Sequence, residues 1–270
     1  MAQLHHLKTW LPCAALAAFC AASSSAQPAA AAAGQAQDSA PATAAASRAS
    51  GGKAPQAGEY ITKKGWGRLL LQNTQGPMKF SLESTSGEDM CELGGTLDGT
   101  KGIAKSDDGS DACKVIFTPT AQGIEVKAAT PAECRDFCGY NGSFQAEYLH
   151  VPEGCGRDAL DRTRTTFKRL YDSRDYKAAL ATLAPALDKC QPTLEWREEG
   201  GMRNDLAITQ YRNGLYAQCL ATLAPYAEDA RKDDNAVTEG WTPMLADDYL
   251  SIVRAARTNL RLCRSKQASR

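Results

Sequence analysis

The chain is poor in histidine, which narrows the chemistry that it can carry. It has three histidines, and two of them, His5 and His6, lie close to its N-terminus. A Ser-His-Asp or Cys-His nucleophile would have to depend on His150 alone, and no second histidine is left to complete a metal site. A lone histidine is far more often a surface or packing residue. We therefore expect no enzyme activity, no cofactor and no metal.

The chain also lacks an excess of either charge and a long apolar stretch after its first residues. Its 31 basic residues balance its 31 acidic ones, and they form no basic block. Such a chain has no electrostatic reason to bind nucleic acid or an anionic membrane surface. Beyond the N-terminal segment no stretch is apolar enough to cross a bilayer, so we predict no membrane span.

Residues 1–26 have the features of a secretory signal peptide. A short apolar run from Trp10 to Ala22 follows a weakly basic start, and Ser24–Ala26 offers a small-x-small cleavage site. The alternative is a lipoprotein acylated at Cys20, which the bulky Phe19 before it disfavours. We expect a periplasmic or secreted protein of a bacterial envelope.

Residues 27–58 consist mostly of Ala, Ser, Gln, Pro and Gly, without aromatic or large aliphatic side chains. Such a segment cannot bury enough apolar surface to offset the entropy lost on ordering. It is predicted to be a disordered linker between the signal peptide and the folded part.

Between residues 59 and 153 the sequence changes to short runs in which apolar and polar residues alternate. Met78–Leu82 is one such run, and turn pairs such as Asp98-Gly99 and Asn141-Gly142 separate them. The Pro131–Gly139 segment interrupts the alternation and suits one short helix. About seven or eight short strands at this spacing predict an antiparallel β-sandwich or small barrel.

From residue 154 the apolar residues recur every three or four positions, which indicates helices. Five such segments joined by short turns predict an all-α domain over 154–264 and a disordered tail over 265–270. The predicted fold class is therefore α+β with two domains. The five predicted helices are Arg157–Asp172, Asp175–Lys189, Glu195–Asn213, Leu215–Asp229 and Asp247–Cys263.

A six-residue phrase occurs twice in this helical part. Leu180–Pro185 returns letter for letter as Leu220–Pro225, and from 180 to 220 the period is 40 residues. A period in this range is typical of stacked helical pairs. Each copy also has a tyrosine, a small residue three places on and a leucine four places further, all on one helical face. They are Tyr176, Ala179 and Leu183 in the first copy and Tyr216, Cys219 and Leu223 in the second.

On these positions the helical part resembles the tetratricopeptide repeats. In that family a small residue on the second helix of each pair has large residues one turn away, and Gly214 matches the glycine between the two helices. The resemblance covers about 75 residues, and the period is longer than the usual one of about 34. Arg174 replaces the equivalent glycine of the first pair, and Pro185 and Pro225 fall within the second helices. The resemblance implies a stack of α-hairpins whose surface binds peptides or proteins.

The cysteines predict disulfides. Ten are present, and loss of Cys13 and Cys20 with the signal peptide leaves an even number in an exported chain. In an antiparallel helical array bridged cysteines must lie at the same end, because a helix of about 16 residues is roughly 24 Å long and bridged Cα atoms lie within about 7 Å. This argument pairs Cys155 with Cys190 and Cys219 with Cys263. Three connectivities stay open for the β domain, and we favour Cys91 with Cys113 and Cys134 with Cys138.

Arg203-Asn204-Asp205 is the most unusual polar group in the helical part. It lies on the first helix of the second pair, and in the family that it resembles this helix often lines the ligand groove. We therefore predict that Arg203, Asn204 and Tyr211 contact a ligand. Helix capping or pairing within the helix is an equal alternative for the polar group.

Two functions remain open. The first is an exported adaptor whose helical surface binds a protein or peptide of the cell envelope, without catalysis. The alternative is a periplasmic lysozyme inhibitor that acts through the β domain, since small disulfide-bonded β domains of the bacterial envelope include such inhibitors. The chain has no motif specific to them, so this alternative depends on similar architecture alone.

Overall fold

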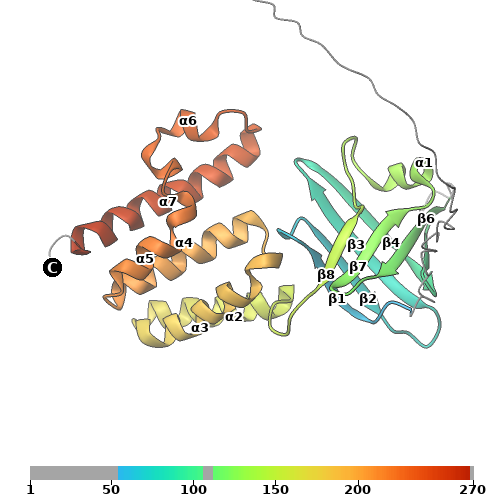
Figure 1. The fold of residues 1–270 in the computed structure, drawn as a ribbon, viewed down its shortest axis with the longest axis horizontal. Helices are drawn as coiled ribbons and strands as arrows, with labels where there is room; N and C mark the ends of the chain where they lie inside the picture. The colour runs from blue at the N-terminus through green and yellow to red at the C-terminus, as the bar shows by residue number, and fades with distance from the viewer. Residues whose placement is uncertain (1–53, 106–111, 268–270) are drawn as a thin grey trace, which may run out of the picture. The chain divides into compact units, whose positions relative to one another are not determined.

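The computed structural model describes residues 54–105 and 112–267 (Figure 1). The predicted signal peptide, with Cys20, and all but the last residues of the predicted linker lie outside this part of the chain. None of the helices in the described ranges combines the length and the apolar character that crossing a bilayer would need.

The first part of the described chain is an antiparallel β-barrel that closes on itself. Each strand pairs with the next, and β1 pairs with β8, where Ile61 lies opposite Leu149. The β-sandwich in the predicted fold class is therefore wrong: two stacked sheets would leave edge strands, whereas this ladder is continuous. The strands are β1 (Gly58–Thr62), β2 (Gly67–Gln72), β3 (Met78–Ser86), β4 (Asp89–Asp98), β5 (Lys101–Ala104), β6 (Cys113–Pro119), β7 (Gly123–Ala128) and β8 (Ala146–His150).

Large apolar side chains fill the barrel interior. The rings of Phe80 and Phe117 meet there, with centroids 5.1 Å apart. Gly102 lies so close to Phe117 that an added Cβ would come within 2.5 Å of its ring. The interior is a packed core, as expected for a barrel of this strand number. Its members include Leu69, Leu71, Leu82, Leu93, Val115, Ile124, Val126 and Tyr148.

The second part of the chain is helical. Its first helix, α2, has the predicted bounds, whereas α7 begins four residues earlier than predicted, at Pro243 rather than Asp247, and continues into the predicted tail. The α-helices of the described residues are α1 (Pro131–Cys134), α2 (Arg157–Asp172), α3 (Tyr176–Cys190), α4 (Trp196–Arg212), α5 (Tyr216–Thr222), α6 (Asp234–Thr238) and α7 (Pro243–Gln267). The short 3-10 turns are η1 (Arg135–Phe137), η2 (Gln191–Thr193), η3 (Ala224–Tyr226) and η4 (Asp229–Arg231).

The two copies of the repeated phrase adopt different structures. Leu180–Pro185 lies inside α3, which continues past its proline, whereas α5 ends at Thr222 and Pro225 lies in η3. The single helix predicted over Leu215–Asp229 is therefore wrong. Pro185 removes one helical hydrogen bond inside α3, whereas Pro225 lies in the first turn of η3, where its missing N–H breaks no helical hydrogen bond. In the first copy the buried residue that follows the proline is Leu187 of α3, whereas in the second copy it is Tyr226, inside the 3-10 turn.

Helix α4 packs against α3, α5 and α7. Gly200 faces Ile252 of α7 so closely that an added Cβ would lie 2.6 Å from its Cδ1. The buried Asn204 donates its Nδ2 to the carbonyl oxygen of Ile252 at 3.2 Å, and its Oδ1 accepts from Asn259 at 3.2 Å. These contacts fix the rotation of α4 about its own axis.

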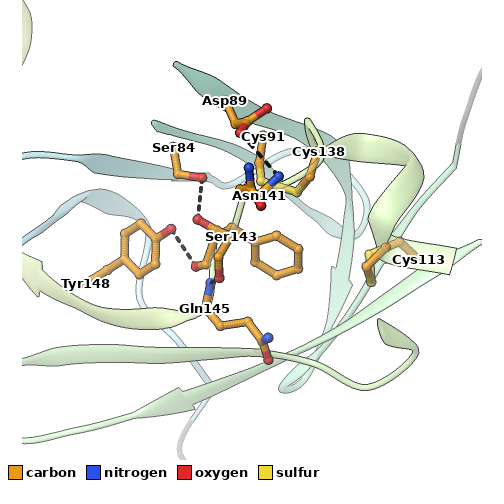
Figure 2. The surroundings of a disulfide bond; sticks show 11 residues. Ser84, Asp89, Cys91, Cys113, Cys138, Asn141, Ser143, Gln145 and Tyr148 are labelled. Atoms are coloured by element: carbon orange, nitrogen blue, oxygen red, sulfur yellow. Dashed lines mark hydrogen bonds between the residues drawn. A yellow bond between two sulfur atoms is a disulfide. The ribbon is translucent and has the colours of Figure 1, made fainter. Parts of the chain in front are cut away.

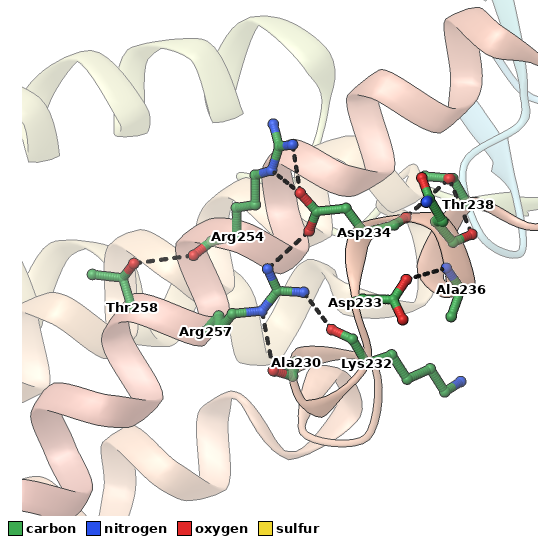
Figure 3. Close-up of polar contacts among 10 residues, drawn as sticks. Ala230, Lys232, Asp233, Asp234, Ala236, Thr238, Arg254, Arg257 and Thr258 are labelled. Atoms are coloured by element: carbon green, nitrogen blue, oxygen red, sulfur yellow. Dashed lines mark hydrogen bonds and ion pairs between the residues drawn. The ribbon is translucent and has the colours of Figure 1, made fainter.

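A cluster of charged side chains holds the segment that carries α6 against α7 (Figure 3). Asp234 accepts from Arg254 at 2.6 Å and from Arg257 at 2.9 Å. Arg257 also donates to the carbonyl oxygens of Ala230 and Lys232, at 3.1 and 2.8 Å. The sequence pattern does not predict α6, because the side chains that anchor it come from a helix further along the chain.

Two disulfides have the partners predicted from the antiparallel helices. Cys155, just before α2, bridges to Cys190 at the end of α3, and Cys219 of α5 bridges to Cys263 near the end of α7. The first clamps one helical hairpin, and the second ties α5 to α7. In total four disulfides form in the described residues, which fits an exported protein.

The two disulfides favoured for the β domain are wrong. Cys91 lies on β4 and Cys113 on β6, and β5 lies between these strands, so the two cysteines are not neighbours. The segment of α1 and η1 lies against the barrel instead of closing on itself. Its first cysteine, Cys134, bridges to Cys113, and its second, Cys138, bridges to Cys91.

Adjacent glycines of α4 should respond to alanine in opposite ways. We expect Gly200→Ala to destabilise the fold by about 1–3 kcal/mol, because the new methyl group overlaps Ile252. Gly201→Ala should stabilise it by roughly 0.5–1 kcal/mol, because the nearest atom to its Cβ, Nη2 of Arg164, lies at an ordinary 3.7 Å. Urea unfolding of both variants checks this, and equal effects would contradict the packing of α4 on α7.

Candidate functional site: a groove between α2 and α4

A polar groove runs along α2 on the side that faces α4. It encloses about 540 Å³ and is open to solvent. Its wall on α2 consists of residues three or four positions apart, which share one helical face, and its wall on α4 is Asp205. The lining residues are Asp161, Arg164, Thr165, Phe167, Lys168, Tyr171, Asp172 and Asp205. We call this hollow the α2–α4 groove.

A cation and an anion face each other across the α2–α4 groove without touching. Arg164 of α2 and Asp205 of α4 are both half-buried and interact electrostatically. Within the described part of the chain, neither side chain has a hydrogen bond or an ion pair within 4.0 Å. Lys168, by contrast, pairs with Asp172 at 3.0 Å. The groove therefore holds one guanidinium, of Arg164, and two carboxylates, of Asp161 and Asp205, that make no hydrogen bond or ion pair within the described residues.

Two carboxyl groups on this side of α4 have a pKa that burial raises, so their ionised forms destabilise the fold at neutral pH. Burial raises the pKa of Asp205, against the opposing effects of Arg164 and Lys168. Burial also raises the pKa of Glu198, against the effects of Arg164 and of a hydrogen bond from the backbone of Glu195. Carboxyl groups with a pKa displaced by burial in a cleft mark candidate functional sites.

Gly201 lies between these two carboxylates on the same face of α4. Spacings of three and four residues place Glu198, Gly201 and Asp205 in one row along the helix. The guanidinium of Arg164 lies above Gly201, with Nη2 3.7 Å from the place of the missing Cβ. Of the two carboxylates, Asp205 lines the groove, whereas Glu198 lines a different hollow together with Glu195 and Arg197. Among the described residues, no three metal-ligating side chains cluster to hold an ion.

Arg203 and Asn204 make their hydrogen bonds inside the helical part. Arg203 donates to Glu199 at 2.9 Å and to the carbonyl oxygen of Thr222 at 3.1 Å. Asn204 bonds to residues of α7, and Tyr211 packs its ring against Tyr216, with centroids 5.6 Å apart. Their contact with a ligand stays a prediction. Of the polar triplet, Asp205 is the residue that lines the groove. Arg164, which also lines the groove, is not a sequence-predicted site residue, although its position on the face of α2 that carries Phe167 and Tyr171 was the available signal.

The barrel carries a second distinctive feature, a turn at Gly139–Gly142 (Figure 2). Two backbone N–H groups of the turn donate to residues at the start of β4. That of Gly139 donates to the carbonyl oxygen of Met90 at 2.8 Å, and that of Asn141 donates to the Asp89 carboxylate at 3.2 Å. Cys138, the residue before the turn, forms a disulfide with Cys91 and so attaches the turn to β4. At its tip Tyr140 is 89% exposed.

The two glycines of this turn are needed for its close packing. An added Cβ on Gly139 would lie 2.3 Å from Oδ1 of Asp89, and one on Gly142 would lie 3.1 Å from the sulfur of Cys91. The turn is therefore rigidly attached, and the ring that it presents contributes little to the barrel core. We call this feature the Tyr140 turn.

Comparison of the chain with protein-family models, with curated proteins and with solved structures gave no match.

The effect of Asp205 on stability should depend on pH. Its pKa is raised in the folded state, so folding favours the protonated form and the ionised form costs stability at pH 7. This cost disappears as the pH falls below about 4, where the unfolded chain is also protonated. We expect Asp205→Asn to raise the Tm at pH 7 and to lose this advantage near pH 3.5.

Thermal unfolding followed by circular dichroism at both pH values measures the difference. Asp188→Asn is the matched control, because Asp188 is an exposed carboxylate of α3 outside the groove. A lower Tm for Asp205→Asn at pH 7 would show that the carboxylate is satisfied in the fold.

Proposed function

We propose that this protein is an exported, protein-binding adaptor whose ligand lies in the α2–α4 groove. The single observation that carries the proposal is the facing pair of Arg164 and Asp205, which remain apart in the groove. Attraction between opposite charges grows as water is excluded, so two half-buried groups of this kind ordinarily pair. Groups kept apart are available to a ligand that bonds to both.

The cost of these groups supports a functional reason for them. Buried polar groups without partners destabilise a fold, and functional sites are where such costs are retained. The resemblance to tetratricopeptide repeats points in the same direction, because it implies a groove lined by the first helices of successive pairs. In this chain those helices are α2 and α4. We place the adaptor in the periplasm, in agreement with its predicted signal peptide and its four disulfides.

Selection of peptides tests the proposal. A random peptide library displayed on phage is selected against the wild-type chain, and enriched peptides are labelled for fluorescence polarisation. We expect Arg164→Gln to weaken their binding at least tenfold, which is about 1.4 kcal/mol, because the groove loses its donor. Arg162→Gln is the matched control, since Arg162 is an exposed arginine on another face of α2.

The adaptor proposal fails if no peptide is enriched over an empty support, or if the Arg164 and Arg162 variants bind equally well. Arg164→Gln should lower the Tm by no more than a few degrees, because Arg164 makes no hydrogen bond or ion pair in the described fold and only its charge favours the ionised Asp205 and Glu198. Arg162→Gln should leave the Tm unchanged.

A second candidate function is inhibition of a lysozyme by the barrel, and the Tyr140 turn favours it. A rigid turn with an exposed aromatic tip loses little entropy on binding, and tyrosine is a frequent anchor in protein interfaces. Such a convex feature suits the cleft of an enzyme better than it suits a flexible peptide. The disulfide-bonded barrel is the domain that this alternative requires.

Clearing of bacterial cell walls by a c-type lysozyme tests the second candidate. The wild-type chain should slow the clearing, and Tyr140→Ala should reduce its potency at least tenfold without changing the Tm. Ile103→Ala is the control, because Ile103 is an exposed apolar residue elsewhere on the barrel, 42% accessible. If clearing is as fast with the wild-type protein as without it, the hypothesis of a lysozyme inhibitor is wrong.

A further inference from the structure

One of the four disulfides in the described residues can be reached from solvent. Both cysteines of the other three bonds are buried, with at most 3% of their surface exposed. In the fourth bond (Figure 2), Cys91 is buried but Cys138 is partly exposed. Cys138 also lines a hollow of about 150 Å³ that borders the Tyr140 turn, and we call it the Cys138 hollow.

Exposure decides which sulfur a thiol can attack, because exchange begins when a thiolate approaches one sulfur of the disulfide. Cys91 is enclosed, and Gly142 packs against it so closely that an added Cβ would lie 3.1 Å from its sulfur. Cys134 lines the Cys138 hollow too, but only 3% of it is exposed. Cys138 therefore offers the accessible sulfur, and exposed disulfides are the ones that are reduced most readily.

The charge of the Cys138 hollow favours an attacking thiolate. Arg135 is on its wall, whereas the acidic residues of the same segment, Glu133 and Asp136, are not among the residues that line it. A nearby guanidinium attracts a thiolate and lowers the pKa of a cysteine thiol. Arg135 should therefore speed both the approach of an anionic reductant and the later release of Cys138 as a thiolate.

We propose that Cys138 is a site of thiol–disulfide exchange, at which a dithiol reductant of the cell envelope opens the Cys91–Cys138 bond. A thiolate of the dithiol attacks the sulfur of Cys138. The bond to Cys91 breaks, and its electron pair stays on the sulfur of Cys91, which takes up a proton. The second thiolate of the dithiol then displaces Cys138, which takes up a proton in turn, and the dithiol leaves as a disulfide. The inference does not depend on either proposed function.

Opening of this bond releases the Tyr140 turn and leaves the barrel closed. The turn then keeps only the weak attachment that the N–H groups of Gly139 and Asn141 provide at the start of β4. The pairing of β1 with β8 that closes the barrel includes neither cysteine of the bond, and Cys134 stays bonded to Cys113. Exchange therefore changes how firmly Tyr140 is presented to a partner, through a local opening of the fold.

Graded reduction tests the inference. The folded wild-type chain is treated with increasing dithiothreitol, the reaction is stopped with acid, and free thiols are labelled with N-ethylmaleimide in urea and located by peptide mapping. We expect Cys91 and Cys138 to be labelled at a dithiothreitol concentration at least tenfold lower than any other cysteine requires. If all the disulfides open together, or if Cys113–Cys134 opens first, the inference is wrong.

Dithiols of opposite charge test the part of Arg135. The rate at which Cys91–Cys138 opens is measured with the anionic 2,3-dimercaptopropanesulfonate and with the cationic dithiobutylamine, each corrected for its thiolate fraction. The anionic dithiol should react at least threefold faster, and Arg135→Gln should remove this preference. Lys101→Gln is the control and should keep it, because Lys101 is an exposed cation of β5 outside the hollow. A preference that survives Arg135→Gln contradicts the inference.

Chymotrypsin reports release of the turn, because it cuts after tyrosine where the backbone is free to enter its active site. We expect selective reduction, or the paired substitutions Cys91→Ser and Cys138→Ser, to speed cleavage after Tyr140 at least tenfold. If the double variant does not fold, the selectively reduced wild-type chain still decides. Cleavage no faster than in the oxidised chain, or cuts spread over the whole barrel, would show that the bond does not control the turn alone, and the inference would be wrong.

Discussion

The close contact of α4 with α7 decides which residues of the helical part meet solvent. Gly200 brings the two helices together at Ile252, and Asn204 holds them there through Ile252 and Asn259. Because that face of α4 packs against α7, the face that carries Gly201 and Asp205 is turned toward the groove. A rotation of α4 by one residue, about 100°, would bury Asp205 and expose the Asn204 network. The candidate site therefore depends on a glycine that does not line the groove.

The same helix shows how stability and binding compete for residues. Helix interiors disfavour glycine by roughly 1 kcal/mol relative to alanine. At Gly200 this cost is offset by close packing against Ile252. At Gly201 no neighbouring atom is close enough to require a glycine. Burial of Asp205 adds a further cost at neutral pH. The disulfides Cys155–Cys190 and Cys219–Cys263 limit the conformations of the unfolded chain, which makes such costs tolerable in a small helical array.

What the sequence predicts well is what depends on local pattern. The bounds of α2 follow from its apolar stripe, and the helical disulfides follow from the alternating direction of successive helices. What it predicts poorly depends on contacts between distant residues. Two identical phrases end differently, and the buried residues that follow them, Leu187 and Tyr226, belong to different core clusters. The barrel disulfides require knowledge that β5 separates β4 from β6, and no spacing of cysteines contains that information.

The candidate site illustrates the same limit at finer scale. In sequence, Arg203-Asn204-Asp205 is one polar triplet, but consecutive residues of a helix point about 100° apart. Arg203 therefore reaches Thr222 near the end of α5, Asn204 reaches α7, and Asp205 reaches the groove. Each residue of the triplet serves a different neighbour, and only the rotation of α4 assigns them. Since that rotation is set by Gly200 and Ile252, 52 residues apart in the numbering, a helical-repeat pattern alone names the helix that lines a groove but not its lining residues.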